Sequence, residues 1–329
     1  MASYPITPKA AEIAVEEAAE RSYDNAVKHL GSRHGILMGK ELLENLTKTV
    51  GSYWLDMDYR DYRDPLDSLS APAATVDARR CLVFADGTMA HTDGAWHEVR
   101  VGTIRSTTAD LQDHKSSIAR LCDVDQLGQD LWRRACQMGY NKAQTRAFIA
   151  DGSHWLWNLA DRYFSKAEKI VDFWHVCEHV GDCAKAFFGE GSDQSRSWSL
   201  RVCGTLRAGE VSEALEIVES LNPRSSPHLR KAKHQLVTYL NNNRQRMNYP
   251  HYESLGLPIG SGEVEAQCKT LVQARCKQAG MRWKSLGLES LLRVRCSVQD
   301  GRYVRQFGNW PTNLAAWQAR KKRQLRNAA

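Results

Sequence analysis

The sequence predicts an α/β protein: a mixed β-sheet flanked by helices and interrupted by an α-helical insertion, with a helical domain at the N-terminus. Three observations support this prediction. Between residues 79 and 183, apolar β runs alternate with amphipathic helices, an order typical of layered α/β domains. Residues 8–56 repeat apolar side chains every three or four positions, as helices do. Residues 184–250 are polar and have the same helical spacing.

The composition excludes several classes of protein. The chain has 329 residues, a net charge of +7 and a sequence pI near 8.9, which suits a nucleic-acid partner but does not require one. Nine scattered cysteines without a CxxC pair argue against a disulfide framework and against a zinc ribbon. Reduced thiols, an acidic N-terminal stretch and the lack of an apolar run of about 18 residues predict a cytoplasmic protein without a membrane span.

Residues 1–60 are predicted to form the N-terminal helical domain, from the stretches AAEIAVEEAAE, SYDNAVKHLG and GKELLENLTKTVGSYW. Three short helices suit a helix-turn-helix unit that docks on DNA, and they suit a small bundle or an oligomerisation unit equally well. Residues 61–78 are charged and contain Pro and Ser, so we expect them to form a linker.

Residues 79–183 are predicted to form the first part of the α/β core. ARRCLVFADGT is an apolar strand ending in an Asp-Gly turn, and HTDGAWHEVRVGTIRS has the turn and the alternation of a hairpin. SSIARLC is a third short strand, and DVDQLGQDLWRRACQMG is an amphipathic helix with Asp123 as its N-cap. TRAFIADGS and HWLWNLADRYF then give a strand and a helix, and AEKIVDFWHVCEHVGDCAKAFF gives a strand that leads into a helix.

The remaining segments complete the predicted organisation. Residues 184–255 are expected to form the helical insertion. Residues 256–300 return to the core, with helix predicted again over residues 263–299 and its start near Gly262. Residues 301–329 are predicted to be a basic tail, whose stretch QARKKRQLR suits either DNA contact or an ordinary chain terminus.

Two aspartates share the context Ala-Asp-Gly at the ends of predicted strands, Asp86 and Asp151. Ligands gather at the carboxyl ends of parallel strands in sheets of this kind. Two carboxylates this close repel each other, so the pair makes most sense around a divalent metal, and Mg²⁺ prefers carboxylate oxygens. An Asp-Gly pair at a strand end is also a common turn, which is the alternative for each aspartate.

A third carboxylate is expected from GSGEVEAQCK, where Ser261 is the predicted N-cap of the helix. At about 100° per residue, Glu265 falls at the edge of the apolar face, whereas Glu263 falls away from its centre and suits the helix dipole. Arg275 projects onto the apolar face, where it would suit a phosphate or a carboxylate. The alternative is that both glutamates only stabilise the start of the helix.

Four motifs in order resemble the ISKra-type insertion-sequence transposases of bacteria, which are Asp-Asp-Glu enzymes with an RNase H-like core. The matching stretches are FADGTMAHTDGAWHEVRVG, FIADGSHWLWNLA, KIVDFWHVCEH, and GLPIGSGEVEAQCK followed by RCKQAGMRW, within residues 80–296. The resemblance implies that Asp86, Asp151 and Glu265 are catalytic ligands of two Mg²⁺ ions, for which Mn²⁺ could substitute. It also implies a helical insertion before Glu265.

Other residues have weaker expectations. Asp172 and His175 match a DxxH pattern of related transposases and are expected near the active site, unless they only close a core strand. Basic and aromatic residues around the glutamate helix suit DNA phosphates or a solvated surface: Lys269, Lys277, Arg282, Trp283 and Lys284. Trp198 could stack on an unpaired DNA base, but it also suits core packing.

The resulting hypothesis is a DNA transposase of an insertion sequence. It would bind the terminal inverted repeats of the element and target DNA, and would catalyse metal-dependent DNA cleavage and strand transfer. We expect a homodimer or a larger homo-oligomer on DNA, a cytoplasmic and nucleoid-associated location, and no membrane. The alternatives are an RNase H-like nuclease without joining activity and a domesticated, non-catalytic DNA-binding protein.

Overall fold

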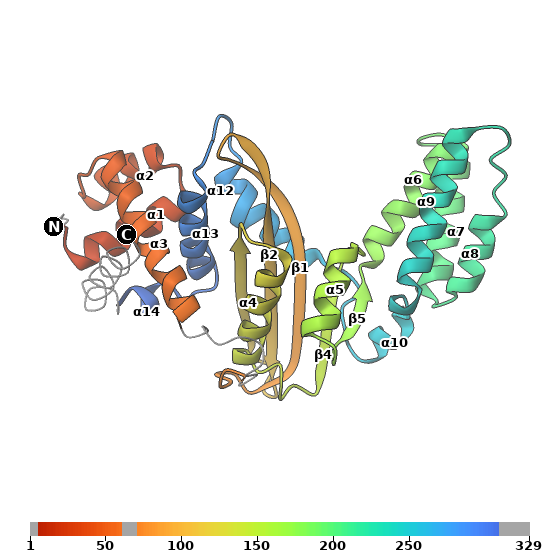
Figure 1. The fold of residues 1–329 in the computed structure, drawn as a ribbon, viewed down its shortest axis with the longest axis horizontal. Helices are drawn as coiled ribbons and strands as arrows, with labels where there is room; N and C mark the ends of the chain where they lie inside the picture. Colours follow the sequence, from red (N-terminus) through yellow and green to blue (C-terminus); the bar gives the residue numbers. More distant parts are fainter. Residues whose placement is uncertain (1–5, 61–70, 309–329) are drawn as a thin grey trace, which may run out of the picture.

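A computed structural model describes residues 6–60 and 71–308 of the chain. Figure 1 shows three parts in a row, namely a group of N-terminal helices, a central sheet with its covering helices, and a helical arm. Among the helices within the described ranges, none is long and apolar enough to cross a membrane. The predicted α/β class, with a mixed sheet flanked by helices, is confirmed.

The central sheet has five strands in the order β3-β2-β1-β4-β5. Its strands are β1 Ala78–Thr92, β2 Ala95–Thr108, β3 Asp113–Arg120, β4 Thr145–Ala150 and β5 Glu168–Val171. The first three strands form an antiparallel meander, and β4 and β5 extend it with parallel pairs. A mixed sheet of this order is compatible with an RNase H-like fold.

Strand β1 is longer than the sequence predicted, and the expected turn at Asp86 is wrong. Asp86 pairs with Val101 inside the ladder, and pairing continues to Thr92. The chain turns instead at Asp93 and Gly94, whose φ values of 49° and 90° suit a tight hairpin. Asp86 is therefore held by strand pairing on the β2 side and is not carried by a turn.

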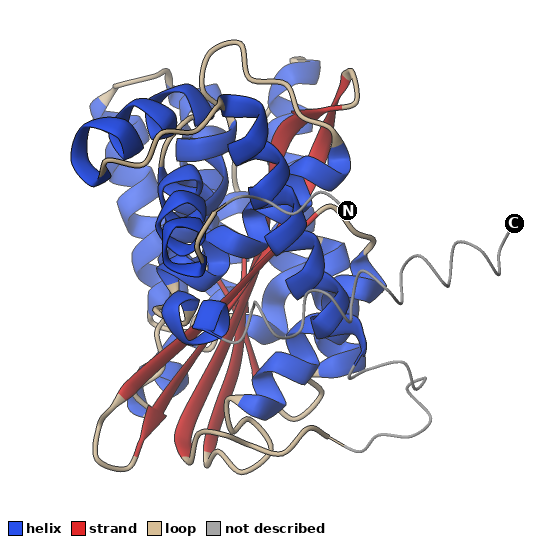
Figure 2. Cartoon of the chain, turned by 90° about the vertical axis from the view of Figure 1, so that its left-hand side faces the viewer, coloured by secondary structure: helices blue, strands red, loops and turns tan. Residues whose placement is uncertain are grey.

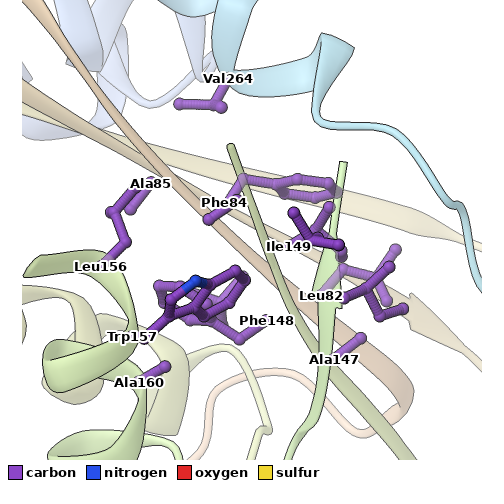
Figure 3. Packing of buried hydrophobic residues seen from close by; sticks show 14 of the residues in the cluster. Leu82, Phe84, Ala85, Ala147, Phe148, Ile149, Leu156, Trp157, Ala160 and Val264 are labelled. Atoms are coloured by element: carbon purple, nitrogen blue, oxygen red, sulfur yellow. The ribbon is translucent and has the colours of Figure 1, made fainter. Parts of the chain in front are cut away.

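Helices cover both faces of the sheet. α4 Val124–Gln137 and α5 His154–Tyr163 pack on one face, where the rings of Phe148 and Trp157 lie 6.3 Å apart. Figure 3 shows Val264 of the later helix α11 Gly262–Gln267 beyond Phe84 and Ile149, with Trp157 on the other side. Because side chains alternate along a strand, Asp86 shares the face of Phe84, two residues earlier, and so faces α11.

The N-terminal helices form a second core together with the C-terminal helices. They are α1 Pro8–Glu20, α2 Tyr23–His29, the π-helical turn η1 Leu30–His34 and α3 Lys40–Arg60, packed with α13 Ser285–Gln299 and α14 Tyr303–Gly308. Figure 2, viewed from the side of these helices, shows them in front of the strands. α3 and α13 touch so closely that a Cβ on Gly51 would lie 2.1 Å from the carbonyl oxygen of Ser290.

The predicted tail is partly wrong, because its first residues form α14. The rings of Tyr303 and Phe307 lie 5.8 and 6.2 Å from the ring of Trp54 in α3. The basic stretch 318–326 and most of the predicted linker, residues 61–70, lie outside the described residues. Residues 303–308 therefore belong to the N-terminal core.

The helical arm begins inside the core with α6 Phe173–Phe188 and continues as the predicted insertion. Its further helices are α7 Asp193–Arg207, α8 Val211–Glu219, α9 Pro227–Asn243, the 3-10 turn η2 Arg244–Arg246 and α10 Tyr249–Ser254. Trp198 is half-buried and packs against Phe188, with ring centroids 5.9 Å apart. The structure shows the alternative interpretation, core packing, because Trp198 packs against the apolar cluster that continues from the sheet into the arm.

Residues 263–299 return to helix as predicted, but the helix is not continuous. The chain forms α11 Gly262–Gln267, a π-helical turn η3 Cys268–Gln273, the short helix α12 Ala274–Cys276 and, after a loop, α13. A π turn adds a residue to the turn, so a projection at 100° per residue fails beyond Cys268. This change of register decides where Arg275 lies.

Candidate functional site

Asp86 presents its carboxylate from the middle of β1 toward α11. Its Oδ1 accepts a hydrogen bond of 2.7 Å from the amide of Gly87, and its Oδ2 lies 3.5 Å from the Cys268 thiol. A Cβ on Gly87 would lie 2.3 Å from Oε1 of the Glu98 side chain, which would have to move aside. The aspartate is half-buried, so its carboxylate remains accessible from the site.

Asp151 directly follows β4 and lies beside Asp86. Phe84 of β1 pairs with Ile149 of β4 in parallel register, which places the two aspartates, each two residues further along, next to each other. Ser153 fixes the Asp151 carboxylate with its amide at 2.8 Å and its hydroxyl at 2.9 Å.

Gly152 gives the backbone after Asp151 its sharp bend. Its φ is 101°, and a Cβ there would lie 2.7 Å from the hydroxyl of Tyr239. That hydroxyl, from α9 of the arm, donates a hydrogen bond of 2.7 Å to the Asp151 carbonyl. The arm therefore buttresses the backbone that carries Asp151.

Asp172 is a fully buried carboxylate that joins three segments. It caps α6 through the amides of Trp174 at 2.6 Å and His175 at 3.3 Å. Its other oxygen accepts bonds from the amide of Ser261, at 2.7 Å, and from the hydroxyl of the same serine. Ser261 was predicted as a side-chain cap of α11, but its hydroxyl serves Asp172 instead. Asp172 thus fixes the start of α11 against the end of β5.

Glu265 lies next to Asp172 and His175. The described part of the chain contains two groups of three possible metal ligands within 4.8 Å of one another, and Asp172, His175 and Glu265 form one. Nδ1 of His175 lies 3.4 Å from Oδ2 of Asp172 and 4.0 Å from Oε1 of Glu265. The pair predicted to be accessory therefore contacts the predicted third ligand.

The trio Asp86, Asp151 and Glu265 is less compact than that group, because it is not among the sets within 4.8 Å in the described chain. Glu265 nevertheless lies one helical turn before Cys268, the residue that contacts Asp86. Three carboxylates from β1, from the end of β4 and from α11 therefore face one region, and His175 lies beside Glu265.

Electrostatics in this region are strongly perturbed. Burial raises the pKa of Asp86, and the negative charge of Asp151 raises it further. For Asp172, burial opposes ionisation, but the nearby imidazole of His175 and the hydrogen bonds from Ser261 and backbone amides outweigh it and lower the pKa. The contact with Asp172 raises the pKa of His175 to about 9 against the effect of burial. His175 is therefore cationic at neutral pH.

Glu263 and Arg275 do not enter the site. Glu263 forms an ion pair of 2.9 Å with Arg105 of β2, so it ties α11 to the sheet as well as standing in the first helical turn. Arg275 was predicted near the active site, which is wrong. It is 1% exposed, donates to the carbonyl of Ala18 at 3.1 Å, and lies over the ring of Tyr23. The π turn before it rotates it toward α1.

The predicted DNA-contacting residues divide into two kinds. Trp283 is half-buried between the two cores and donates to the carbonyl of Cys276 at 3.0 Å. Its DNA contact stays a prediction. The four basic residues are exposed: Lys269, Lys277, Arg282 and Lys284. Lys269 lies 3.9 Å from Glu265, whereas Lys277 lies over the ring of Trp96.

Several positioning residues were missed by the sequence analysis. Cys268 and Ser261 stand within the quoted motif, but the spacing gave no signal that they would contact Asp86 and Asp172. Tyr239 lies 88 residues after the aspartate whose carbonyl it binds, and only the folded arm brings it there. The Ala-Asp-Gly repeat did identify Gly152.

In comparisons with known proteins, no family model matches this chain, and the search of curated proteins gives no match. The interpretation of the site therefore rests on its own geometry and donor set. Carboxylate oxygens are the ligands that hard divalent cations prefer. Burial is the main reason that the pKa of Asp86 is raised, and the nearby charge of Asp151 adds to it. In the described chain, the group Asp172, His175 and Glu265 could hold a metal ion.

Proposed function

We propose that the chain is a DNA transposase with an RNase H-like catalytic core. One observation carries the proposal: carboxylates from the middle of β1, the end of β4 and the helix after the insertion face one region. In the sequence, the whole helical arm lies between Asp151 and Glu265. Shared use of three carboxylates from such distant segments favours a reaction that needs a metal-binding pocket.

In this proposal Asp86, Asp151 and Glu265 hold Mg²⁺. When bound, Mg²⁺ would activate an attacking water or hydroxyl and stabilise the leaving oxygen at phosphorus. The residues of the chain do the positioning. Asp172 fixes the start of α11 through Ser261, and His175, cationic at neutral pH, orients Glu265 and offers positive charge to a phosphate.

The substrate of the proposed reaction is DNA. The chain carries a net charge of +7, and exposed basic side chains flank Glu265 and the following loop. Such residues would bind phosphates in a salt-dependent manner. Transposition must hold two element ends together, so we expect a dimer or a larger assembly on DNA.

The experiment uses the full chain, Mg²⁺, a target plasmid and a donor plasmid that carries the DNA flanking the gene. Wild type should cut the flanking DNA and join its 3′ ends to the target. Asp86→Asn, Asp151→Asn and Glu265→Gln should each abolish joined product. Glu263→Gln is the matched control, because its carboxylate binds Arg105 outside the site, and it should retain activity.

Three results would contradict the proposal. If Asp86→Asn or Glu265→Gln still forms joined product, the carboxylate site does not catalyse the reaction. Cleavage without joined product would favour the nuclease alternative, and a wild-type protein that binds this DNA without cutting it would favour the non-catalytic alternative.

A further inference from the structure

The N-terminal helices carry a second cluster of possible metal ligands, which the proposed reaction does not use. Glu17 of α1, His29 at the end of α2 and His34 at the end of η1 each offer an atom within 4.8 Å of the others. Nδ1 of His29 lies 2.9 Å from Oε2 of Glu17, and Nε2 of His34 lies 3.5 Å from Oε1. Both imidazoles therefore face the two oxygens of one carboxylate.

A π-helical turn brings the two histidines together. Residues five apart on a regular α-helix point about 140° away from each other. Within Leu30–His34 the turn is wider, and the amide of Gly35 bonds to the carbonyl of Leu30. The imidazole rings of His29 and His34 consequently lie 5.8 Å apart. π turns are rare in proteins as a whole, but those that occur often lie at functional sites. This π turn therefore points to a functional role for His29 and His34.

The polar atoms in the cluster are incompletely satisfied. Among the described residues, no hydrogen-bond partner meets the buried Nδ1 of His29, although Oε2 of Glu17 is at 2.9 Å. Arg21 donates to the same Oε2, which leaves Oε1 of Glu17 facing His34. A nitrogen and an oxygen that face each other without a well-directed hydrogen bond would both be satisfied by a cation.

We propose that Glu17, His29 and His34 bind one Zn²⁺ ion, with water as the fourth ligand. Two imidazoles and one carboxylate with one open position form a known donor set of zinc, and imidazole favours such borderline metals over Mg²⁺. The histidine side chains are 31% and 33% exposed. A hollow of about 500 Å³ lies beside the cluster and is lined in part by His29.

Zinc at this site would fasten α1 to the turn that follows α2. Apolar side chains of α1, α2 and η1 already pack together in the second core. A ligand that binds the folded form and not the unfolded chain raises the stability of the unit. This role is independent of the proposed transposase activity, so either proposal can fail without the other.

The test titrates the metal-free full chain with Co²⁺, whose visible absorption reports ligand type, and then displaces it with Zn²⁺. His175→Gln/Glu265→Gln serves as the background, because it removes the other cluster. This background protein should bind one Co²⁺, and its unfolding midpoint should rise with Zn²⁺. His29→Gln or His34→Gln should lose both effects, whereas His228→Gln, an exposed histidine of α9, should keep them.

Misfolding of a histidine variant would not leave the proposal untested. X-ray absorption of the Zn²⁺-loaded background protein, which needs no change in the cluster, should show two imidazoles among four nitrogen or oxygen ligands. Failure of this protein to bind Co²⁺ or Zn²⁺ would overturn the proposal. So would a zinc ion with fewer than two imidazoles, or unchanged binding in folded His29→Gln and His34→Gln.

Discussion

Replacing Asp172 by asparagine tests whether one buried carboxylate holds the site together. Both of its oxygens accept hydrogen bonds, Oδ1 from the amides of Trp174 and His175 and Oδ2 from the amide and hydroxyl of Ser261. An asparagine must place its NH₂ group at one of these positions. In either orientation of the amide, its NH₂ group faces at least one backbone N–H. That backbone N–H then has no acceptor.

The magnitude follows from these contacts. A buried donor left without an acceptor costs about 1–3 kcal/mol, and each remaining bond loses about 1 kcal/mol when its acceptor is no longer charged. Asp172 is 0% exposed, so solvent does not compensate. We expect Asp172→Asn to lower the free energy of unfolding by about 3–5 kcal/mol.

Urea denaturation followed by circular dichroism measures this loss. The matched control is Asp182→Asn on α6, whose carboxylate forms an exposed ion pair of 3.0 Å with Lys185, and which should leave the midpoint unchanged. Because the folded-state pKa of Asp172 is lowered, its contribution is present above the unfolded value of about 3.9 and is lost as the pH falls further. A free energy of unfolding for Asp172→Asn that lies within about 1 kcal/mol of the wild-type value would refute the reasoning.

Two further predictions concern the helix contact and the histidine. Gly51→Ala should destabilise the chain by about 1–3 kcal/mol in thermal unfolding, because its Cβ would lie 2.1 Å from the Ser290 carbonyl oxygen. Gly181→Ala, with no described atom within 4 Å of the new Cβ, should stabilise α6 by about 0.5–1 kcal/mol, and an equal effect of both changes would contradict the close approach. His175 should titrate near pH 9 in an NMR experiment. Its stabilising contribution is full below its unfolded pKa of about 6.5 and is lost as the pH rises through about 9, so a titration midpoint near 6.5 would rule out the contact with Asp172.

Helix and strand periodicity was sufficient to predict the α/β class, the helical arm and the N-terminal helices. Asp151 was correctly placed at a strand end, because Ala-Asp-Gly marks the position where a buried strand must turn. The same Ala-Asp-Gly motif gave a wrong prediction of a turn at Asp86, where β1 continues to Thr92. An Asp-Gly pair specifies that a turn is allowed, and the neighbouring strand β2 decides whether the chain uses it.

By itself, the sequence determined the types of the elements and the order of the acidic residues along the chain. Only the tertiary structure decided which of these residues meet. The π turn after Gln267 carries Arg275 away from the carboxylates and buries it beside Tyr23. Asp172 accepts a hydrogen bond from Ser261, which lies 89 positions later in the sequence. Local periodicity cannot predict a widened helical turn or a hydrogen bond between residues so far apart in the sequence, because packing between distant segments stabilises both.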